Sequence, residues 1–389
     1  MRKLITLSAL IVLSHSLLAQ SYKKVHDDAI VVDTHNDILM LIMDKDVVID
    51  TDLKGKTHTD LARWKQGGLD VQVFSVFCDG DQKNPYQFAN REMDTADAIA
   101  ARNAGKIVKV ANTTELAKAV KQHKIAMLFG VEGGHMMEDD LSKLDTMYQR
   151  GVRYMTLTWN NSTSWATSAY DETFKADLTR KGLTDFGKQV VKRMNELGML
   201  VDISHVGEQT FSDVMNTTTK PVIASHSSVY NLCHHQRNLK DDQIKAIAKN
   251  GGVIQVNFYS AFIDSSYNPK KAAFFEKYKP QIDSLVLTGM AEHQVEDFMF
   301  RTHKAETDAF RPPFSLVIDH IEYIIKLAGV DYVGLGSDFD GIESAPQQLD
   351  DVTSYPLITK ALLERGYSKK DVTKVLGGNF LRVLKANEK

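Results

Sequence analysis

The chain has 389 residues, of which 43% are hydrophobic and 25% charged, and its formal net charge is −3. This is an ordinary globular composition with ample apolar material for a large core. The slightly acidic balance does not favour a nucleic-acid partner, which would need a basic patch. The length permits two or three domains, although a single barrel of this size is also common.

The first residues have the pattern of a secretory signal peptide. A short basic start and a mostly apolar run over residues 4–18 precede Ala19, a small residue suited to cleavage. The run is shorter than the roughly 20 residues that a membrane span needs, and the chain ends in the polar stretch RVLKANEK. We therefore expect residues 1–19 to be a signal peptide. Residues 20–389 are then a single exported domain, periplasmic or secreted, without a stable membrane anchor.

Only two cysteines are present, Cys78 and Cys233. Export permits disulfides, so the sequence allows either one bridge or two free thiols. Two cysteines do not make a disulfide-scaffolded protein.

Short apolar stretches alternate with longer amphipathic ones along the chain. Eight stretches are predicted strands: 29–35, 69–77, 125–132, 153–159, 199–205, 220–226, 251–258 and 331–340. Between them, segments such as 183–198 and 240–252 are amphipathic, and the apolar residues of the first follow helical spacing. Strand followed by helix, repeated eight times, predicts a parallel (β/α)8 barrel of the TIM type. A doubly wound open sheet is the alternative, because periodicity cannot show closure.

Two gaps between predicted strands are too long for plain crossovers. We expect two helices in residues 78–124. We interpret residues 260–315 as a helical insertion before the last strand, on the catalytic rim, because loops of this length are usually functional or carry their own helices. A solvated helical decoration is an equally good interpretation of this segment.

Several predicted strands end in a side chain that can bind a metal ion. The carboxyl ends of barrel strands converge on one site, so residues far apart in sequence would meet there. A single histidine at a strand end is more often a hydrogen-bonded core residue, so the prediction depends on recurrence. The candidates are His35, Asp37, Glu132, His205, His226 and Asp338. Imidazoles with carboxylates suit zinc, and the set exceeds what one ion needs, which favours two ions bridged by a carboxylate.

Other residues near the strand ends are candidates for weaker reasons. Arg237 follows the sixth strand and could bind a substrate carboxylate, or it forms a surface salt bridge. Asp33 could orient a metal ligand, or it makes a hydrogen bond at the edge of the core. Asn257 and Tyr259 end the seventh strand, where pocket lining and, for the aromatic residue, core packing are equally plausible.

The sequence resembles a known family. The motifs DTHND, GVEGGH, DISH, IASHSS…RNL and GSDFDG occur in this order and resemble those of the membrane (renal) dipeptidases and their bacterial relatives. The resemblance runs from about residue 28 to residue 384, except for the insertion. It implies a metallo-dependent-hydrolase type of (β/α)8 barrel, commonly a homodimer, that cleaves dipeptides, often with a D-residue at the second position.

The resemblance also implies a binuclear zinc site. His35, Asp37 and Glu132 would hold one zinc ion. Glu132 would bridge to a second ion that is also held by His205 and His226. The bridging position makes Glu132 a catalytic residue as well as a ligand.

The substrate end of the site follows the family pattern less closely. The resemblance implies that Asp338 handles the proton of the attacking water and that Arg237 binds the dipeptide carboxylate. Many relatives carry a histidine where this chain has Trp159, whose indole donates a hydrogen bond but cannot be protonated. We expect Trp159 and Tyr259 to contact the substrate. The alternatives are an amidohydrolase acting on N-acyl amino acids or cyclic amides, and a non-catalytic exported protein that binds metal or peptide.

Overall fold

The structure is a computed structural model that describes residues 22–45, 47–290 and 292–389. The predicted signal peptide, residues 1–19, lies outside the described residues. Within those described ranges, no helix combines the length and the apolar character that a membrane crossing requires.

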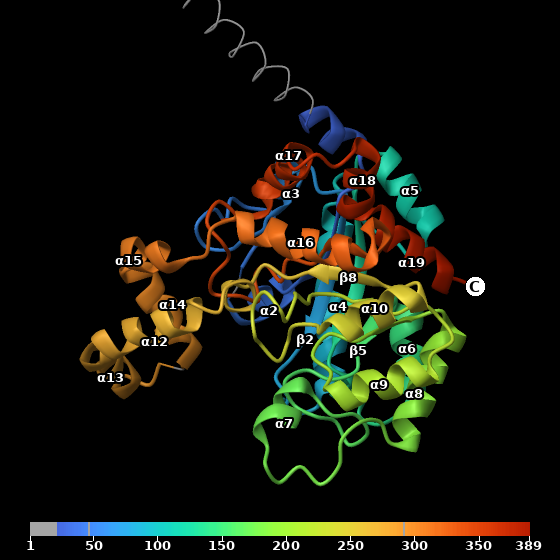
Figure 1. Cartoon of the computed structure of the whole chain (residues 1–389), viewed down its shortest axis with the longest axis horizontal. Coiled ribbons are helices and arrows are strands. Elements are labelled where there is room, and N and C mark those ends of the chain that lie inside the picture. The colour runs from blue at the N-terminus through green and yellow to red at the C-terminus, as the bar shows by residue number, and fades with distance from the viewer. Residues whose placement is uncertain (1–21, 46, 291) are drawn as a thin grey trace, which may run out of the picture.

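Eight parallel strands form the centre of the molecule, in the order β1-β2-β4-β5-β6-β7-β8-β9 (Figure 1). Their bounds are β1 Val32–Asn36, β2 Val71–Phe77, β4 Ile125–Glu132, β5 Val152–Thr156, β6 Leu200–Asp202, β7 Ile223–Ala224, β8 Val253–Val256 and β9 Val333–Leu335. A bridge between Asn36 and Phe339 joins the first strand to the segment after the last. The Asp37 amide donates to the Phe339 carbonyl at 3.0 Å and the Asp338 amide to the His35 carbonyl at 3.2 Å. The predicted TIM-type barrel is confirmed, and the open-sheet alternative is wrong.

Most strands are shorter than the sequence predicts. The stretch 199–205 contributes only β6 and the stretch 220–226 only β7, so His205 and His226 lie in the loops that follow. The gap 78–124 contains the two expected helices, α4 Pro85–Arg102 and α5 Thr113–Lys121. It also contains a short strand that we did not expect, β3 Ile107–Lys109, which pairs with residues 125–127 at the start of β4. Strand β5 pairs with β4 only from Phe129 onward.

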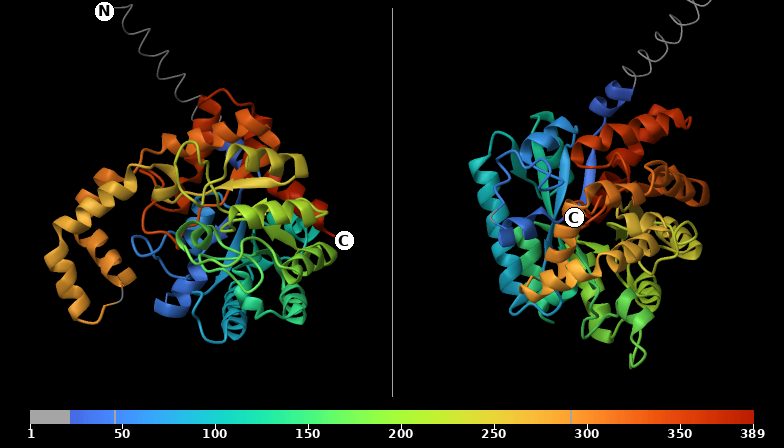
Figure 2. Two further views of the ribbon diagram at one scale, coloured as in Figure 1. Left: turned by 60° about the horizontal axis from the view of Figure 1, so that its bottom comes forward. Right: turned by 90° about the vertical axis from the view of Figure 1, so that its left-hand side faces the viewer.

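Helices surround the strands (Figures 1 and 2). The labelled α-helices outside the insertion are α2 Ile38–Lys45, α3 Leu61–Gln66, α4, α5, α6 Leu141–Arg150, α7 Ala169–Phe174, α8 Asp185–Leu197, α9 Glu208–Thr217, α10 Asp241–Asn250, α16 Ser315–Ala328, α17 Tyr355–Glu364, α18 Lys369–Thr373 and α19 Asn379–Asn387. Residues 22–28, before β1, are also helical. Helix α8 shows why these segments are helical. The Thr184 hydroxyl caps its first turn, Val190 and Met194 bury one face, and Gly198, with a φ of 86°, ends it in the left-handed region.

The barrel interior is filled at the end opposite the predicted site. Val32, Leu128 and Tyr154 belong to one apolar cluster of strand side chains, to which α19 contributes Phe380 and Leu384. This packing leaves the carboxyl ends of the strands for polar side chains. The two cysteines, Cys78 and Cys233, are both buried and free, so no disulfide links them.

The insertion consists of helices that follow β8. They are α11 Ser260–Ile263, α12 Tyr267–Lys277, α13 Lys279–Leu287, α14 Glu292–Thr302 and α15 Lys304–Phe310. Helices α12 to α15 project to one side of the barrel in Figure 1 and in the left-hand view of Figure 2. They have a small core of their own, which includes Tyr267, Phe274, Met299 and Phe310.

Candidate metal centre and active site

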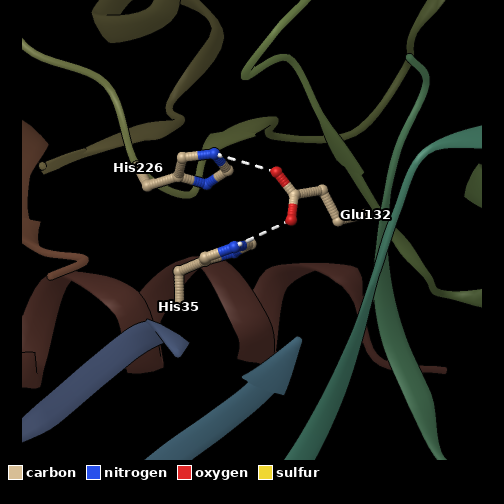
Figure 3. A group of neighbouring side chains, drawn as sticks. All are labelled: His35, Glu132 and His226. Carbon is tan, nitrogen blue, oxygen red and sulfur yellow. Dashed lines mark hydrogen bonds and ion pairs between the residues drawn. The ribbon is translucent and has the colours of Figure 1, made fainter. Parts of the chain in front are cut away.

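Glu132, the last residue of β4, lies between histidines from three other strand ends. Its Oε2 is 3.2 Å from Nε2 of His35, and its Oε1 is 2.9 Å from Nε2 of His205 and 3.4 Å from Nε2 of His226. Figure 3 shows the carboxylate between His35 and His226. The Nε2 atoms of His205 and His226 are only 3.0 Å apart. One carboxylate therefore faces three imidazole nitrogens that converge on it.

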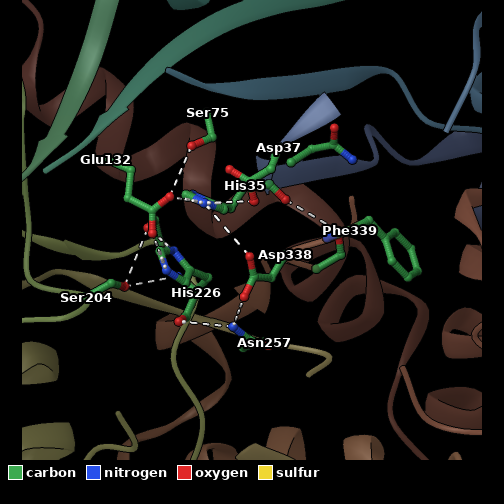
Figure 4. Close-up of polar contacts among 12 residues, drawn as sticks. His35, Asp37, Ser75, Glu132, Ser204, His226, Asn257, Asp338 and Phe339 are labelled. Atoms are coloured by element: carbon green, nitrogen blue, oxygen red, sulfur yellow. Dashed lines mark hydrogen bonds and ion pairs between the residues drawn. The ribbon is translucent and has the colours of Figure 1, made fainter. Parts of the chain in front are cut away.

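Two further carboxylates complete the cluster on the side of β1 and β9 (Figure 4). Nε2 of His35 is 3.5 Å from Oδ2 of Asp37 and 4.0 Å from Oδ1 of Asp338. Two overlapping triads each offer ligand atoms within 4.8 Å of one another: His35, Glu132 and His226, and His35, Asp37 and Asp338. The buried Oδ1 of Asp37 has no hydrogen-bond partner among the described residues.

The ring orientation of His35 is set by Tyr154, a residue of β5. The Tyr154 hydroxyl donates to the Thr34 carbonyl at 2.9 Å, so its oxygen accepts the proton of His35 Nδ1 at 2.8 Å. This tautomer leaves the lone pair of Nε2 directed at the cluster. Metal-binding histidines are typically oriented by such a bond from the other ring nitrogen.

The other two histidines have the same arrangement. The Ser225 hydroxyl donates to Asp202 at 2.6 Å, so it accepts the Nδ1 proton of His226 at 2.8 Å. Nδ1 of His205 donates to the side-chain oxygen of Asn160 at 3.2 Å. The Nδ1 of each imidazole thus has an acceptor, which leaves each Nε2, facing Glu132, as the ring atom that can bind a metal ion.

Burial and neighbouring charges set the ionisation of the cluster. Burial acts to raise the pKa of Glu132, but the facing His35, His205 and His226 outweigh it and hold that pKa well below its usual range. Burial lowers the pKa of His205 to about 3 and that of His226 well below its usual value. Burial, with the negative charge of Asp37, raises the pKa of Asp338 well above its usual range. Burial acts to lower the pKa of His35, but the neighbouring Tyr154, Glu132 and Asp37 outweigh it and raise that pKa well above its usual value. The cluster therefore combines two uncharged imidazoles with an ionised Glu132, forms that bind a metal ion.

Two of these residues have a strained backbone. His205 and Asp338 both have a φ of 63°, in the left-handed region that non-glycine residues rarely occupy. The His205 carbonyl accepts bonds from the Ala169 amide at 2.7 Å and the Thr158 hydroxyl at 3.2 Å, which hold this conformation. Strain of this kind is concentrated at functional sites.

The side chains fit a divalent metal ion. Three imidazole nitrogens with fixed orientation and several buried carboxylate oxygens form a donor set suited to zinc or a similar ion. The Oδ1 atom of Asp37, which has no hydrogen-bond partner among the described residues, is a further oxygen that could bind such an ion.

Arg237 lies beside the cluster. Its side chain is buried over the Phe262 ring, and one guanidinium nitrogen donates to the His226 carbonyl at 3.3 Å. Its Nε has no hydrogen-bond partner in the part of the chain that the structure describes, and burial lowers its pKa to about 10. A cavity of about 300 Å³ lies next to His205 and Arg237. A buried cation with unused donors next to a cavity can receive a carboxylate.

The remaining candidates lie around this cluster in different ways. Trp159 packs edge-to-face on Phe77, with ring centroids 5.0 Å apart. The Tyr259 hydroxyl donates to Glu343. Asp33 accepts bonds from the amide and hydroxyl of Ser337 at 2.9 and 2.7 Å, so it joins β1 to the loop after β9.

Four residues that orient the histidines are not among the candidates from the sequence: Tyr154, Asn160, Asp202 and Ser225. Tyr154 is part of an ordinary apolar strand pattern, and Asn160 lies in a polar loop. A usable signal did exist for the other two. Each of the motifs DISH and ASH places a serine directly before the histidine, and the first also contains Asp202.

A TIM-type barrel with converging imidazoles and carboxylates at its carboxyl end belongs to the class of metal-dependent hydrolases. The family model of the membrane dipeptidases (Peptidase family M19) matches residues 19–389. A protein named as an uncharacterized dipeptidase of Schizosaccharomyces pombe is 34% identical over 394 residues, which cover 96% of this chain and 84% of the relative. The chain belongs to the membrane dipeptidase family and is a metallo-dipeptidase, which hydrolyses dipeptides.

Solved structures share the fold at 22% sequence identity. The probable dipeptidase PvdM from Pseudomonas aeruginosa aligns with a TM-score of 0.77, over 96% of this chain and 99% of its own. A metallo peptidase from Rhodobacter sphaeroides, liganded with a phosphinate mimic of the dipeptide L-Ala-D-Ala, aligns with a TM-score of 0.74, over 92% of this chain and 100% of its own.

Proposed function

We propose that this metallo-dipeptidase uses two zinc ions and accepts dipeptides with a C-terminal D-residue as well as L,L-dipeptides. The observation that carries the two-ion proposal is the position of Glu132. Its two carboxylate oxygens face different histidines, His35 on one side and His205 with His226 on the other. A carboxylate in this position can bridge two ions.

The stereochemical part of the proposal has a separate basis. The similar structure from Rhodobacter sphaeroides holds a mimic of L-Ala-D-Ala. In this chain Arg237 is the recognition element. Its unused donors would bind the free carboxylate of the second residue, and that contact does not depend on the configuration of the α-carbon.

When bound, the metal ions polarise the scissile carbonyl and lower the pKa of the attacking water. The residues of the chain do the rest. Arg237 holds the substrate carboxylate and so positions the peptide bond. Asp338, next to the cluster, accepts the water proton and donates it to the leaving amine. Glu132 would hold the metal ions with its two carboxylate oxygens.

The substrate experiment measures amino-acid release from L,L- and L,D-dipeptides and from their N-acetylated forms. It uses the mature protein reconstituted with zinc and a chelator-treated control. The expected result is chelator-sensitive cleavage of the free dipeptides of both configurations. Cleavage of the acetylated forms alone would instead identify an acyl-amino-acid amidohydrolase. Binding of dipeptides without turnover would identify a binding protein.

Export and self-association complete the proposal. We expect an N-terminus at Gln20 in the mature protein, which mass spectrometry of secreted or periplasmic material would detect. We expect a homodimer, which light scattering of the purified protein would measure.

A further inference from the structure

Asn257, directly after β8, contacts the predicted proton carrier. Its Nδ2 donates to Oδ2 of Asp338 at 2.8 Å, and its Oδ1 accepts from the Tyr259 amide at 2.5 Å. The second bond fixes which end of the amide faces Asp338. Asn257 is completely buried, and Figure 4 shows the bond to Asp338. One oxygen of Asp338 is thereby occupied, and the other faces His35.

Tyr259 is itself tied to the loop that carries Asp338. Its hydroxyl donates to Glu343, five residues beyond Asp338. A second hydrogen bond joins the same two segments, since the Ser260 amide donates to the Ser344 carbonyl at 2.9 Å. The segments after β8 and β9 are therefore held against each other at the position of the catalytic carboxyl.

The insertion supplies the positive charge at the end of this chain of contacts. Nζ of Lys271, on α12, is 2.7 Å from Oε1 of Glu343, and it also pairs with Glu296 on α14. The side chains of Lys271 and Glu343 are only 20% and 18% exposed. An ion pair at this depth is screened less than a surface pair and holds its geometry more firmly. Removing one partner would leave a partly buried charge without compensation.

We propose that Asn257 is a positioning residue for Asp338 and that the insertion holds it in place through Lys271, Glu343 and Tyr259. The inference rests on the proposed function in one respect, the role of Asp338 as proton carrier. It assigns the insertion a role in turnover through Asp338. Asn257 and Arg237 share only the His226 carbonyl as an acceptor, at 3.5 and 3.3 Å.

The first test is a double-mutant cycle. Asn257→Ala is expected to lower kcat by about 10–100-fold, the usual effect of removing a partner that orients a site residue. KM and the metal content should change little. In an Asp338→Asn background, Asn257→Ala should have a much smaller effect, because only its longer contact with the His226 carbonyl, at 3.5 Å, is then still lost. Wild-type kcat in Asn257→Ala, or an equal loss in both backgrounds, would overturn the proposal.

The second test asks whether the insertion takes part. Lys271→Met is expected to lower kcat without raising KM, and Lys271→Arg should restore it. Lys277→Met is the matched control, because Lys277 lies on the same helix and pairs with Glu306 within the insertion. Equal effects of the two methionine variants would overturn this part. Should Lys271→Met not fold, Glu343→Gln removes the charge while keeping an acceptor for Tyr259 and carries the same prediction.

A structural readout separates this proposal from the proposed function. Crystal structures of Asn257→Ala and Lys271→Met should show a displaced Asp338 carboxyl, and that of Lys277→Met should not. An unmoved Asp338 in the first two would overturn the proposal even in an active dipeptidase. If the wild-type protein cleaves no dipeptide, the proposed function is wrong. The crystal structures of the variants would still show whether Asn257 and Lys271 position Asp338.

Discussion

The hydroxyl oxygen of Tyr154 lies 2.8 Å from Nδ1 of His35, and it can only accept the proton there because its own proton is donated to the Thr34 carbonyl. A residue of β5 thus sets the tautomer of a candidate ligand on β1. The same contact ties the barrel core to the site, since Tyr154 is also part of the apolar cluster inside the barrel.

Tyr154→Phe should therefore weaken metal binding. The variant leaves the buried Nδ1 of His35 without an acceptor, and loss of such a partner costs about 10–100-fold in metal affinity. Competition with a chromogenic chelator measures this. Tyr170→Phe, at a tyrosine that is 46% exposed, is the control. Equal affinities of the two variants would show that the hydroxyl does not orient His35.

Asp338→Asn tests the proton carrier. The amide keeps the size of the side chain but cannot accept a proton, so kcat should fall by about 100–10,000-fold. The metal content should stay close to that of the wild type, because five other candidate ligands remain. Rates and elemental analysis on the same samples give both numbers. A variant with wild-type turnover would remove Asp338 from the mechanism.

Arg237→Met tests carboxylate recognition. Loss of a charge-assisted hydrogen-bonded contact of about 1.5–3 kcal/mol should raise KM for dipeptides by about 10–100-fold. The wild type should discriminate strongly against dipeptide amides, which lack the carboxylate, and the variant should not. Unchanged discrimination between acid and amide in Arg237→Met would place the carboxylate elsewhere.

Much of the fold was predictable because a (β/α)8 barrel repeats one local pattern. The strand ends were less predictable. The stretches 199–205 and 220–226 are apolar over most of their length, but ladder pairing stops at Asp202 and Ala224, where the loops turn inward with the histidines. The strand β3 was missed because a three-residue strand has no periodicity to detect.

The candidate site was predictable to a similar extent. The candidate ligands lie at the carboxyl ends of the strands, so the topology of the barrel groups them even though the sequence gives no distances. Tyr154 and Asn160 could not be found in this way, because only the folded chain brings them to His35 and His205. Lys271 and Glu343 are likewise ordinary surface-type residues in the sequence, and their pairing depends on how the insertion packs against the loop after β9.

A pH-dependent stability effect is expected away from the site. Asp70 accepts a hydrogen bond from the Val31 amide at 2.9 Å, and burial raises its pKa from 3.8 to about 6. Ionisation therefore costs more in the folded state, so the free energy of unfolding falls as the pH rises from about 4 to about 6, by about 2–3 kcal/mol.

Asp70→Asn keeps the acceptor and removes this loss. Relative to the wild type, the variant should gain stability between pH 4 and pH 7 in urea unfolding experiments. Asp52→Asn, at an exposed carboxyl, is the control. A difference from the wild type that does not change with pH would contradict the assignment to Asp70.

The most direct measurement is a zinc titration of the metal-free protein, followed by the rate of D-alanine release from L-Ala-D-Ala. A binuclear dipeptidase bridged by Glu132 predicts activity that rises and then levels off at two zinc ions per chain. Glu132→Gln should stay inactive throughout the titration. A plateau at one ion, or zinc binding without any release of D-alanine, would contradict the binuclear mechanism proposed for this chain.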